Sequence, residues 1–280
     1  MTPEKPPKMP PEIPLIMACQ VSIENFRCRS DNSERIKTAV QLLSLCRENR
    51  VDLLTLPAGY LLAKSPAEIP RLFKPILQHA KRLSLSFAIG VDTAPILNHI
   101  NRPTSPAFLE LTKRGKIPCF LAVFSHERNS FNVYRQRSAT SMHAEMKCVS
   151  DRIMAERRTI SIKSHEISLL ICGEYLDGRV YGNRHKSHLI FVHSTLSRLG
   201  MSMRSRSRGN LGLLALEHRS CENGLIYCFR NGRDISVRSR RAGIAKGKGP
   251  WINIAVWTIG DDGFFKPSGL NPENSFLYGN

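Results

Sequence analysis

Residues 52–56 read DLLTL, the middle one of three short apolar runs that decide the fold class of this chain. The run before it is LIMACQVSI, residues 15–23, and the run after it is LSFAIGV, residues 85–91. Runs of this length are typical of buried strands. In the two segments between them, residues 31–50 and 66–83, apolar side chains recur every three or four positions, as in an amphipathic helix. This alternation predicts an α/β fold in which helices pack on a sheet.

The rest of the chain is predicted to be richer in strands. A helix is predicted over residues 210–223. Nearer the N-terminus, Pro57 and Gly59 are expected to end the strand that begins at residue 52. Residues 261–280, rich in Gly, Pro and Asn, are predicted to form a loop. Apolar runs indicate further strands at residues 119–124, 131–134, 159–162, 167–172, 189–193 and 225–229.

Length and composition favour one domain. With 280 residues, 41% of them hydrophobic, the chain can bury a sizeable core, so we expect one domain over residues 15–280 after a flexible, Pro-rich lead, residues 1–14. Two smaller domains are the alternative. The sequence contains no run of about 18 apolar residues, so a membrane span is not expected. The eight cysteines include no Cys-x-x-Cys pair, and the lead lacks a signal-peptide pattern. A reducing, cytoplasmic location is therefore expected, with neither a cofactor nor a bound metal.

The chain carries a formal net charge of +18. About half of it arises between Arg198 and Lys248, where 12 Lys and Arg residues stand against three acidic residues. A field of this sign attracts nucleic acid and other polyanions. The alternative is a solvated basic surface, because no zinc-finger spacing or aromatic RNA-binding motif accompanies the charge. The candidate contacts for a polyanion are Arg204, Arg206, Arg208, Arg238, Arg240 and Arg241.

Cys172 is the candidate nucleophile of the chain. It ends the apolar run ISLLIC and is followed by Gly173 and Glu174. A thiol at the end of a strand beside Gly can be reached by a substrate, and the backbone N–H that follows can stabilise an oxyanion. The alternative is a core cysteine at the end of a buried strand.

Four parts of the sequence resemble, in order, motifs of the nitrilase (carbon–nitrogen hydrolase) superfamily. The strand with Gln20 and the segment DLLTLP, residues 52–57, resemble its first two strands, the second of which ends in Leu/Phe-Pro-Glu. VYRQR, residues 133–137, resembles its Tyr-Arg-Lys segment, and CGE, residues 172–174, resembles its strand-end nucleophile. Residues 221–232, with Glu-Asn-Gly and then Asn-Gly, resemble the passage that follows.

The resemblance implies a four-layer α-β-β-α sandwich and a Glu–Lys–Cys triad that acts on amides or nitriles. In such a triad the Glu takes the thiol proton, the Cys attacks the carbonyl or nitrile carbon, and the Lys stabilises the developing negative charge. The resemblance also implies a small amide-like or nitrile-like ligand and assembly into a homo-oligomer.

Two of the three triad positions are changed in this chain. Ala58 occupies the position that matches the Glu, and Gln136 occupies the position that matches the Lys. A methyl group cannot accept a proton, and a neutral amide cannot lower the pKa of a thiol as an ammonium group does. General-base help is typically worth about 10²–10⁴ in rate, so little amidase activity by the standard route is expected.

Other side chains are candidates for the missing roles. Glu145 lies nine residues after Gln136, Glu174 follows the nucleophile, and His193 ends the next predicted strand. Each has an ordinary alternative, namely a surface carboxylate, a helix cap or a structural imidazole. Positive charge is available from Arg135, Arg137 or Arg179, although arginine cannot act as a base at neutral pH. The pair His185-x-x-His188 is a weak metal pattern without a third ligand.

Three hypotheses follow from the sequence. The leading one is a catalytically degenerate protein of nitrilase fold that acts by binding or as a partner subunit. The second is an active thiol amidohydrolase or acyltransferase that uses Cys172 with relocated acid and base groups. The third is a protein that binds nucleic acid or another polyanion through residues 198–248.

Overall fold

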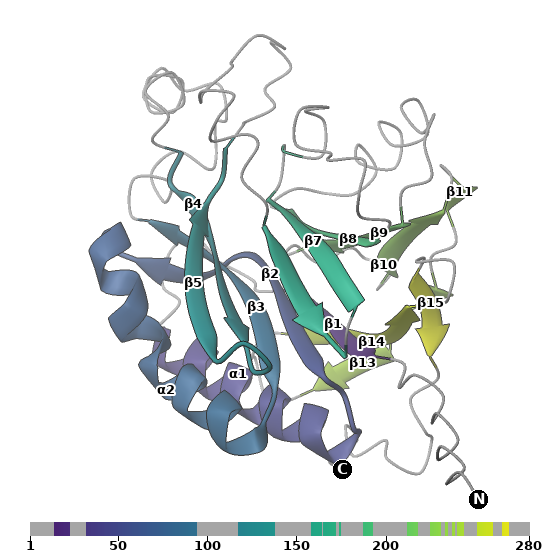
Figure 1. Ribbon diagram of the computed structural model, residues 1–280, viewed down its shortest axis with the longest axis horizontal. Coiled ribbons are helices and arrows are strands. Elements are labelled where there is room, and N and C mark those ends of the chain that lie inside the picture. Colours follow the sequence, from purple (N-terminus) through teal and green to yellow (C-terminus); the bar gives the residue numbers. More distant parts are fainter. Residues whose placement is uncertain are drawn as a thin grey trace, which may run out of the picture.

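Two β-sheets face each other in the computed structural model, and helices cover the outer face of the first sheet (Figure 1). The described layers therefore run helix, sheet, sheet. The expected second helical layer lies outside the described residues, as does most of the N-terminal lead. The backbone is described for residues 14–22, 32–93, 117–137, 158–163, 165–171, 174, 187–192, 212–217, 225–230, 233–234, 237–238, 240–243, 251–259 and 265–268.

The first sheet has eight strands among the described residues, in the order β13-β14-β1-β2-β3-β4-β5, with β15 paired to β14. β1, β2 and β3 run parallel to one another, as expected for strands joined by helical crossovers. The strands are β1 (Leu15–Ser22), β2 (Leu53–Ala63), β3 (Ser86–Thr93), β4 (Cys119–Ser125), β5 (Ser130–Arg135), β13 (Arg240–Gly243), β14 (Trp251–Ile259) and β15 (Phe265–Ser268).

The second sheet has seven strands among the described residues, in the order β11-β10-β9-β8-β7-β6, with β12 paired to β10. β7, β8 and β9 are parallel, and β6 is antiparallel to β7. The strands are β6 (Thr159–Ile162), β7 (His165–Ile171), β8 (Ser187–Val192), β9 (Gly212–Glu217), β10 (Leu225–Arg230), β11 (Arg233–Asp234) and β12 (Val237–Arg238).

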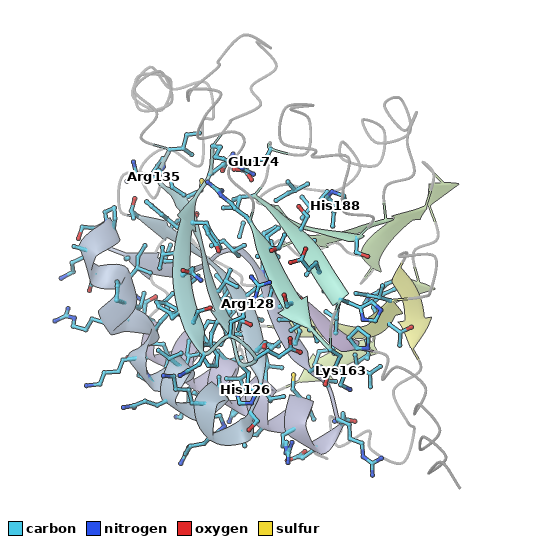
Figure 2. The ribbon with its side chains drawn as sticks, viewed as in Figure 1. His126, Arg128, Arg135, Lys163, Glu174 and His188 are labelled. Atoms are coloured by element: carbon cyan, nitrogen blue, oxygen red, sulfur yellow. The ribbon has the colours of Figure 1, made fainter. Side chains whose placement is uncertain are left out.

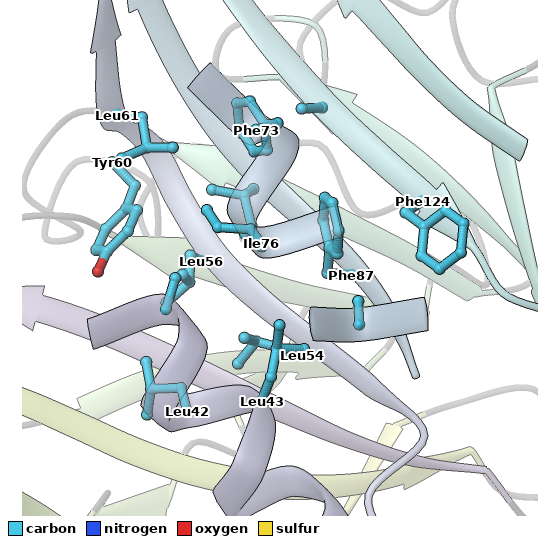
Figure 3. Packing of buried hydrophobic residues seen from close by; sticks show 14 of the residues in the cluster. Leu42, Leu43, Leu54, Leu56, Tyr60, Leu61, Phe73, Ile76, Phe87 and Phe124 are labelled. Atoms are coloured by element: carbon cyan, nitrogen blue, oxygen red, sulfur yellow. The ribbon is translucent and has the colours of Figure 1, made fainter. Parts of the chain in front are cut away.

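Helices α1 (Asn32–Glu48) and α2 (Ile69–Leu83) pack on the first sheet, and a 3₁₀ turn, η1 (Pro66–Glu68), precedes α2. The buried residues of α2 recur every three or four positions, which confirms the predicted amphipathic helix. Neither α1 nor α2 combines the length and the hydropathy that a membrane crossing requires. Figure 3 shows the helix-side core that they complete, which includes Leu42, Leu43, Leu54, Leu56, Tyr60, Phe73, Ile76, Phe87 and Phe124.

A histidine lies at the contact between the two helices. Arg82 Nη2 donates to Nδ1 of His79 over 2.7 Å, and Nε2 of His79 lies 2.9 Å from Ser44 Oγ. Because Nδ1 of His79 accepts this bond, the proton of the neutral imidazole is on Nε2, which therefore donates to Ser44 Oγ. Burial, together with the charge of Arg82, lowers the pKa of His79 below its ordinary value of 6.5.

We expect His79 to make the protein less stable in acid. The unfolded chain binds the imidazole proton more tightly than the folded chain, so the free energy of unfolding falls as the pH is lowered below about 6.5. In His79→Gln, which keeps one donor and one acceptor, this part of the pH dependence is absent. Urea unfolding between pH 5 and 8 measures it, and equal pH slopes for wild type and variant would contradict the assignment.

β2 continues through the two residues that were expected to stop it. Its pairing with β3 shifts register between Leu56 and Leu61, and Gly59 has a positive φ of 68°. Pro57, which has no N–H, therefore sits where no regular ladder bond is needed. Gly90 of β3 lies directly beneath this bulge, and a Cβ there would be 2.3 Å from both Ala58 Cα and Pro57 O.

Three segments differ from the sequence predictions. Residues 212–217, predicted as part of a helix, form β9, because parallel β8 and antiparallel β10 pair with its two edges. Residues 265–268, predicted as loop, form β15 beside β14. β14 itself was not predicted, although it pairs with the whole of β1. For β9 and β14, partners that are distant in sequence decide the structure, whereas β15 forms a hairpin with β14, which comes just before it in the chain.

Ion pairs join the two sheets at one end. Lys163, in the turn between β6 and β7, lies 3.1 Å from Asp52, which also accepts the N–H of Leu15. Arg128, in the turn between β4 and β5, donates to Ser161 over 2.6 Å and to Glu166 over 3.2 Å. These contacts join the start of β2 and the β4–β5 turn to β6, β7 and the turn between them. We call the side of the molecule where the β4–β5 hairpin meets the β6–β7 hairpin the inter-sheet edge.

Candidate functional site

Ala58 occupies the space between the two sheets. Its side chain is 1% exposed and belongs to a buried cluster contributed by both sheets, which we call the inter-sheet core. The bulge in β2 and the missing Cβ of Gly90 bring the backbone of Ala58 against β3. Besides Ala58, the inter-sheet core includes Ile16, Leu53, Ala88, Cys119, Leu121, Val123, Ile160, Ile167, Leu169, Ile171, Leu189, Phe191 and Trp257.

Gln136 lies directly after β5, the last strand of the first sheet. Its backbone N–H donates to Cys119 O over 2.8 Å, and the residue is 5% exposed. Side chains of a strand alternate between its two faces. Phe131 and Val133 pack against the helix-side core, whereas Tyr134 packs against the inter-sheet core. Alternation therefore places Gln136 on the same face as Tyr134, toward the second sheet.

Asp92 is a buried carboxylate in the same row of the sheet. It pairs across β3 and β4 with Cys119, whose carbonyl accepts the N–H of Gln136. Ala88 of β3 belongs to the inter-sheet core, and alternation gives Asp92 the same face. Asp92 is 0% exposed. Burial lowers the pKa of Arg35 in α1 to about 10, and electrostatic interactions with Tyr60 and then Asp92 partly oppose this lowering. A carboxylate, a thiol and an amide thus occupy neighbouring strands at one end of the sheet.

Glu174 is a buried carboxylate that binds several donors. Its side chain is 0% exposed. Oε1 accepts from the backbone N–H of Arg137 over 2.6 Å, from Nε of Arg137 over 3.3 Å and from Nη1 of Arg158 over 3.1 Å. Oε2 accepts the backbone N–H of Ile171 over 2.9 Å. One carboxylate therefore binds two guanidinium groups and two backbone amides.

These bonds connect three parts of the chain that are far apart in sequence. Arg137 follows β5, Arg158 precedes β6, and Ile171 ends β7. The Arg158 guanidinium also lies over the ring of Tyr134, with its carbon 5.4 Å from the ring centroid. Figure 2 shows Glu174 near Arg135, at the end of the sheets opposite Lys163. Glu174 therefore bonds the segment after β5, which contains Gln136, to the end of β7, the strand that precedes Cys172.

Comparison with known proteins rests on structure. No family model matches the sequence, and no curated protein matches it. An amidase from Nesterenkonia sp. superposes with a TM-score of 0.55 at 12% identity, over 88% of this chain and 91% of the amidase. A CN-hydrolase superfamily protein from Xanthomonas campestris superposes with a TM-score of 0.53 at 14% identity, over 87% of this chain and 90% of that protein. The chain has the nitrilase fold.

The nitrilase fold of this chain brings together only part of the predicted site. Ala58 lies in the inter-sheet core, and Gln136 lies at the end of β5 on the face toward the second sheet. Glu174, predicted as a candidate helper for catalysis or a helix cap, is the centre of the ion-pair cluster. Cys172, Glu145 and His193 lie outside the described residues, as do Arg179 and His185.

The arginines predicted as alternative cations have different surroundings in the nitrilase fold. Arg137 binds Glu174, and Arg135 stacks over the ring of Phe120 at 4.9 Å.

Of the arginines predicted to contact a polyanion, Arg204, Arg206 and Arg208 lie outside the described residues. Arg238 lies on β12, and Arg240 and Arg241 lie on β13, so these three are in strands of different sheets.

The weak metal pattern gains no support from the described residues. His188 is 2% exposed on β8 and is paired in register with Ser168 of β7. Among the described side chains, no group of three or more His, Cys, Asp or Glu residues could hold a metal ion.

Sequence reasoning missed Asp92 and Arg158. A signal for Asp92 was present, because it interrupts the apolar run FAIGV-D-T, and a charged residue there needs a structural or chemical reason. Arg158 stands in the basic segment ERRT, where nothing local marks one arginine as buried. Only the pairing of β6 with β7 brings it to Glu174.

Proposed function

We propose that this protein binds a small amide-like or nitrile-like ligand between its two sheets without hydrolysing it through a Glu–Lys–Cys triad. The proposal rests above all on Ala58, a methyl group buried in an apolar cluster at the position that matches the general base. Gln136 supports it further, since an amide can donate a hydrogen bond to a ligand but brings no charge. Binding is therefore preserved better than turnover.

The direct test compares binding with turnover in the wild-type protein. Titration calorimetry with butyramide and butyronitrile should detect binding, while prolonged incubation should release neither ammonia nor butyric acid. The matched variant is Gln136→Leu, which keeps much of the volume but removes the hydrogen-bonding amide, and it should weaken binding about tenfold. Ammonia release that disappears in Cys172→Ala would contradict the proposal.

A double-mutant cycle tests whether positions 58 and 136 share one site. Ala58→Glu buries a carboxylate in an apolar cluster and should cost about 3–5 kcal/mol of unfolding free energy. Adding Gln136→Lys supplies an ammonium, and we expect a favourable coupling of about 0.5–3 kcal/mol, measured by urea unfolding. Ala88→Glu is the control, because Ala88 is also buried in the inter-sheet core but lies four residues along β3 from Asp92, which is the β3 residue in the row of Gln136. Equal coupling of positions 58 and 88 with Lys at 136 would contradict a shared site.

Asp92 favours a second candidate function, an active thiol hydrolase with a relocated base. Neighbouring strands lie about 4.8 Å apart, so a side chain on β3 is about 10 Å from one on β5 in the same row. Asp92 is thus close enough to Gln136 for both to contact one small ligand. In this alternative the Asp92 carboxylate takes the proton of the Cys172 thiol as sulfur bonds to the amide carbonyl carbon, and it passes that proton to the departing amine or ammonia as the carbon–nitrogen bond breaks. Water then attacks the thioester, which releases the acid and restores the thiol.

The reactivity of Cys172 separates the two candidates. An activated thiol is alkylated by iodoacetamide with a rate that titrates well below the ordinary thiol pKa of about 8.5. Mass spectrometry identifies the labelled cysteine, with Cys172→Ala as the control. A low apparent pKa that Asp92→Asn raises would favour the hydrolase, whereas an ordinary value unaffected by Asp92→Asn favours ligand binding alone.

A further inference from the structure

The outer face of α2 is basic and carries no exposed acidic side chain. Arg71, Lys74, Lys81 and Arg82 are all exposed there, and we call this set the basic face of α2. The nearest carboxylate, Glu68, precedes the helix and is paired with Arg71 over 3.2 Å and with the N–H of Lys64. Figure 2 shows side chains of this helix extending away from the sheet.

The neighbouring helix shows that this charge is not a general property of the helical layer. On α1 the exposed basic residues Lys37 and Arg47 are balanced by the exposed acidic residues Glu34 and Glu48. Lys37 also lies 4.0 Å from Glu34. The two helices pack on the same sheet, so the positive charge is concentrated on one of them.

The spacing of the basic face suits a row of phosphates. At 100° and 1.5 Å per residue, its four members fall within about 100° of the helix circumference and extend over roughly 16 Å. One strand of a nucleic acid duplex presents a phosphate about every 3.4 Å along its axis. The basic face therefore spans about five phosphates, enough for each side chain to reach a different one.

A lipid surface fits this face less well. Helices that bind membranes insert an exposed apolar side into the bilayer. The apolar side of α2 is already used, because Ile69, Phe73, Ile76 and Ala80 are buried against the first sheet. Gln78 and Pro75 are the exposed residues between the basic ones, so no bulky apolar group is available for insertion.

We propose that the basic face of α2 is a docking surface for the phosphate backbone of a nucleic acid. Recognition is independent of base sequence, because the contacts are made by charged side chains to phosphates. The formal net charge of +18 adds long-range attraction. The surface is separate from the space between the sheets, so the proposal does not depend on the ligand or on turnover there.

The test is the salt dependence of binding to a labelled 30-base-pair DNA duplex, measured by fluorescence anisotropy with the full chain between 50 and 200 mM KCl. The variant Arg71→Gln/Lys74→Gln/Lys81→Gln removes three contacts and leaves the Arg82–His79 bond intact. Each contact contributes about 0.9 to the slope of log K against log salt. Over this range the wild-type protein should therefore lose about 40-fold more affinity than the variant.

The matched control is Lys37→Gln/Arg47→Gln/Arg50→Gln, which removes the same charge from exposed positions of α1 and the turn after it. It should keep the wild-type slope. Equal slopes for the α2 variant and the wild type would overturn the proposal, as would an equal change in both variants, which indicates net charge alone. Tighter binding to anionic phospholipid vesicles than to DNA, at equal phosphate concentration, would also overturn it.

Discussion

Glu174→Gln is expected to lower the melting temperature by about 6–20 °C. The change keeps the shape of the side chain but replaces one carboxylate oxygen with an N–H₂ group that faces other donors. Arg137 and Arg158 are then left buried without the charge that they bind. Removing one partner of a buried ion pair typically costs about 3–5 kcal/mol, and each kcal/mol shifts the melting temperature of a large domain by about 2–4 °C. Thermal unfolding followed by circular dichroism measures the shift.

The matched control for this change is Glu166→Gln. Glu166 also binds an arginine across the two hairpins, but both side chains of the Arg128–Glu166 pair are about half exposed. Exposed pairs of this kind are worth about 0–1 kcal/mol. A similar melting temperature for the two variants would show that the Glu174 cluster contributes no more than a surface pair.

Gly90→Ala is expected to cost more than larger substitutions nearby. The added Cβ would lie 2.3 Å from Ala58 Cα and from Pro57 O, and both of these are backbone atoms that no rotamer change can move. β2 must then shift away from β3 along the bulge. Overpacking in a core typically costs 1–3 kcal/mol, and we expect about 3 kcal/mol or more here. Urea unfolding of the purified variant measures the cost.

Ala88→Val is the control for Gly90→Ala. It adds two carbon atoms rather than one, on the same strand and toward the same inter-sheet core, where its neighbours include side chains that can rotate. A greater loss of stability in Ala88→Val than in Gly90→Ala would contradict the close backbone approach of β2 to β3.

Local patterns in the sequence were sufficient for most of the fold. α2 was predicted because its apolar residues follow the helical period and meet one sheet face. β4 and β7 were predicted because each is a short apolar run between polar turns. In these elements the residues that decide the structure are close together in the chain.

Elements decided by distant partners were not predictable in this way. The sequence LGLLALE, residues 211–217, has the composition of a helix, and only its two neighbouring strands make it β9. Pro57 and Gly59 ordinarily end a strand, yet the bulge opposite Gly90 lets β2 continue past both. Long-range packing overrides local preference in both cases.

The same distinction between local patterns and distant partners applies to the residues of the candidate site. Ala58 and Gln136 were identified because motifs in a fixed order point to their positions in the chain. The partners of Glu174 are 37 and 16 residues away, and Asp92 joins the row of Gln136 only through the pairing of β3 with β4. Neither relation leaves a pattern in a single sequence.

The bonds at the two ends of the inter-sheet edge have a mechanical consequence. Lys163 and Arg128 bond the two sheets together at one end, and Glu174, which binds both Arg137 and Ile171, does so at the other. Sliding of one sheet along the other would stretch both sets of bonds at once, so along this edge the two sheets move as one body. For the ligand that we propose to bind between the sheets, adaptation to its size is therefore left to side-chain rotation, which restricts the range of molecules that fit.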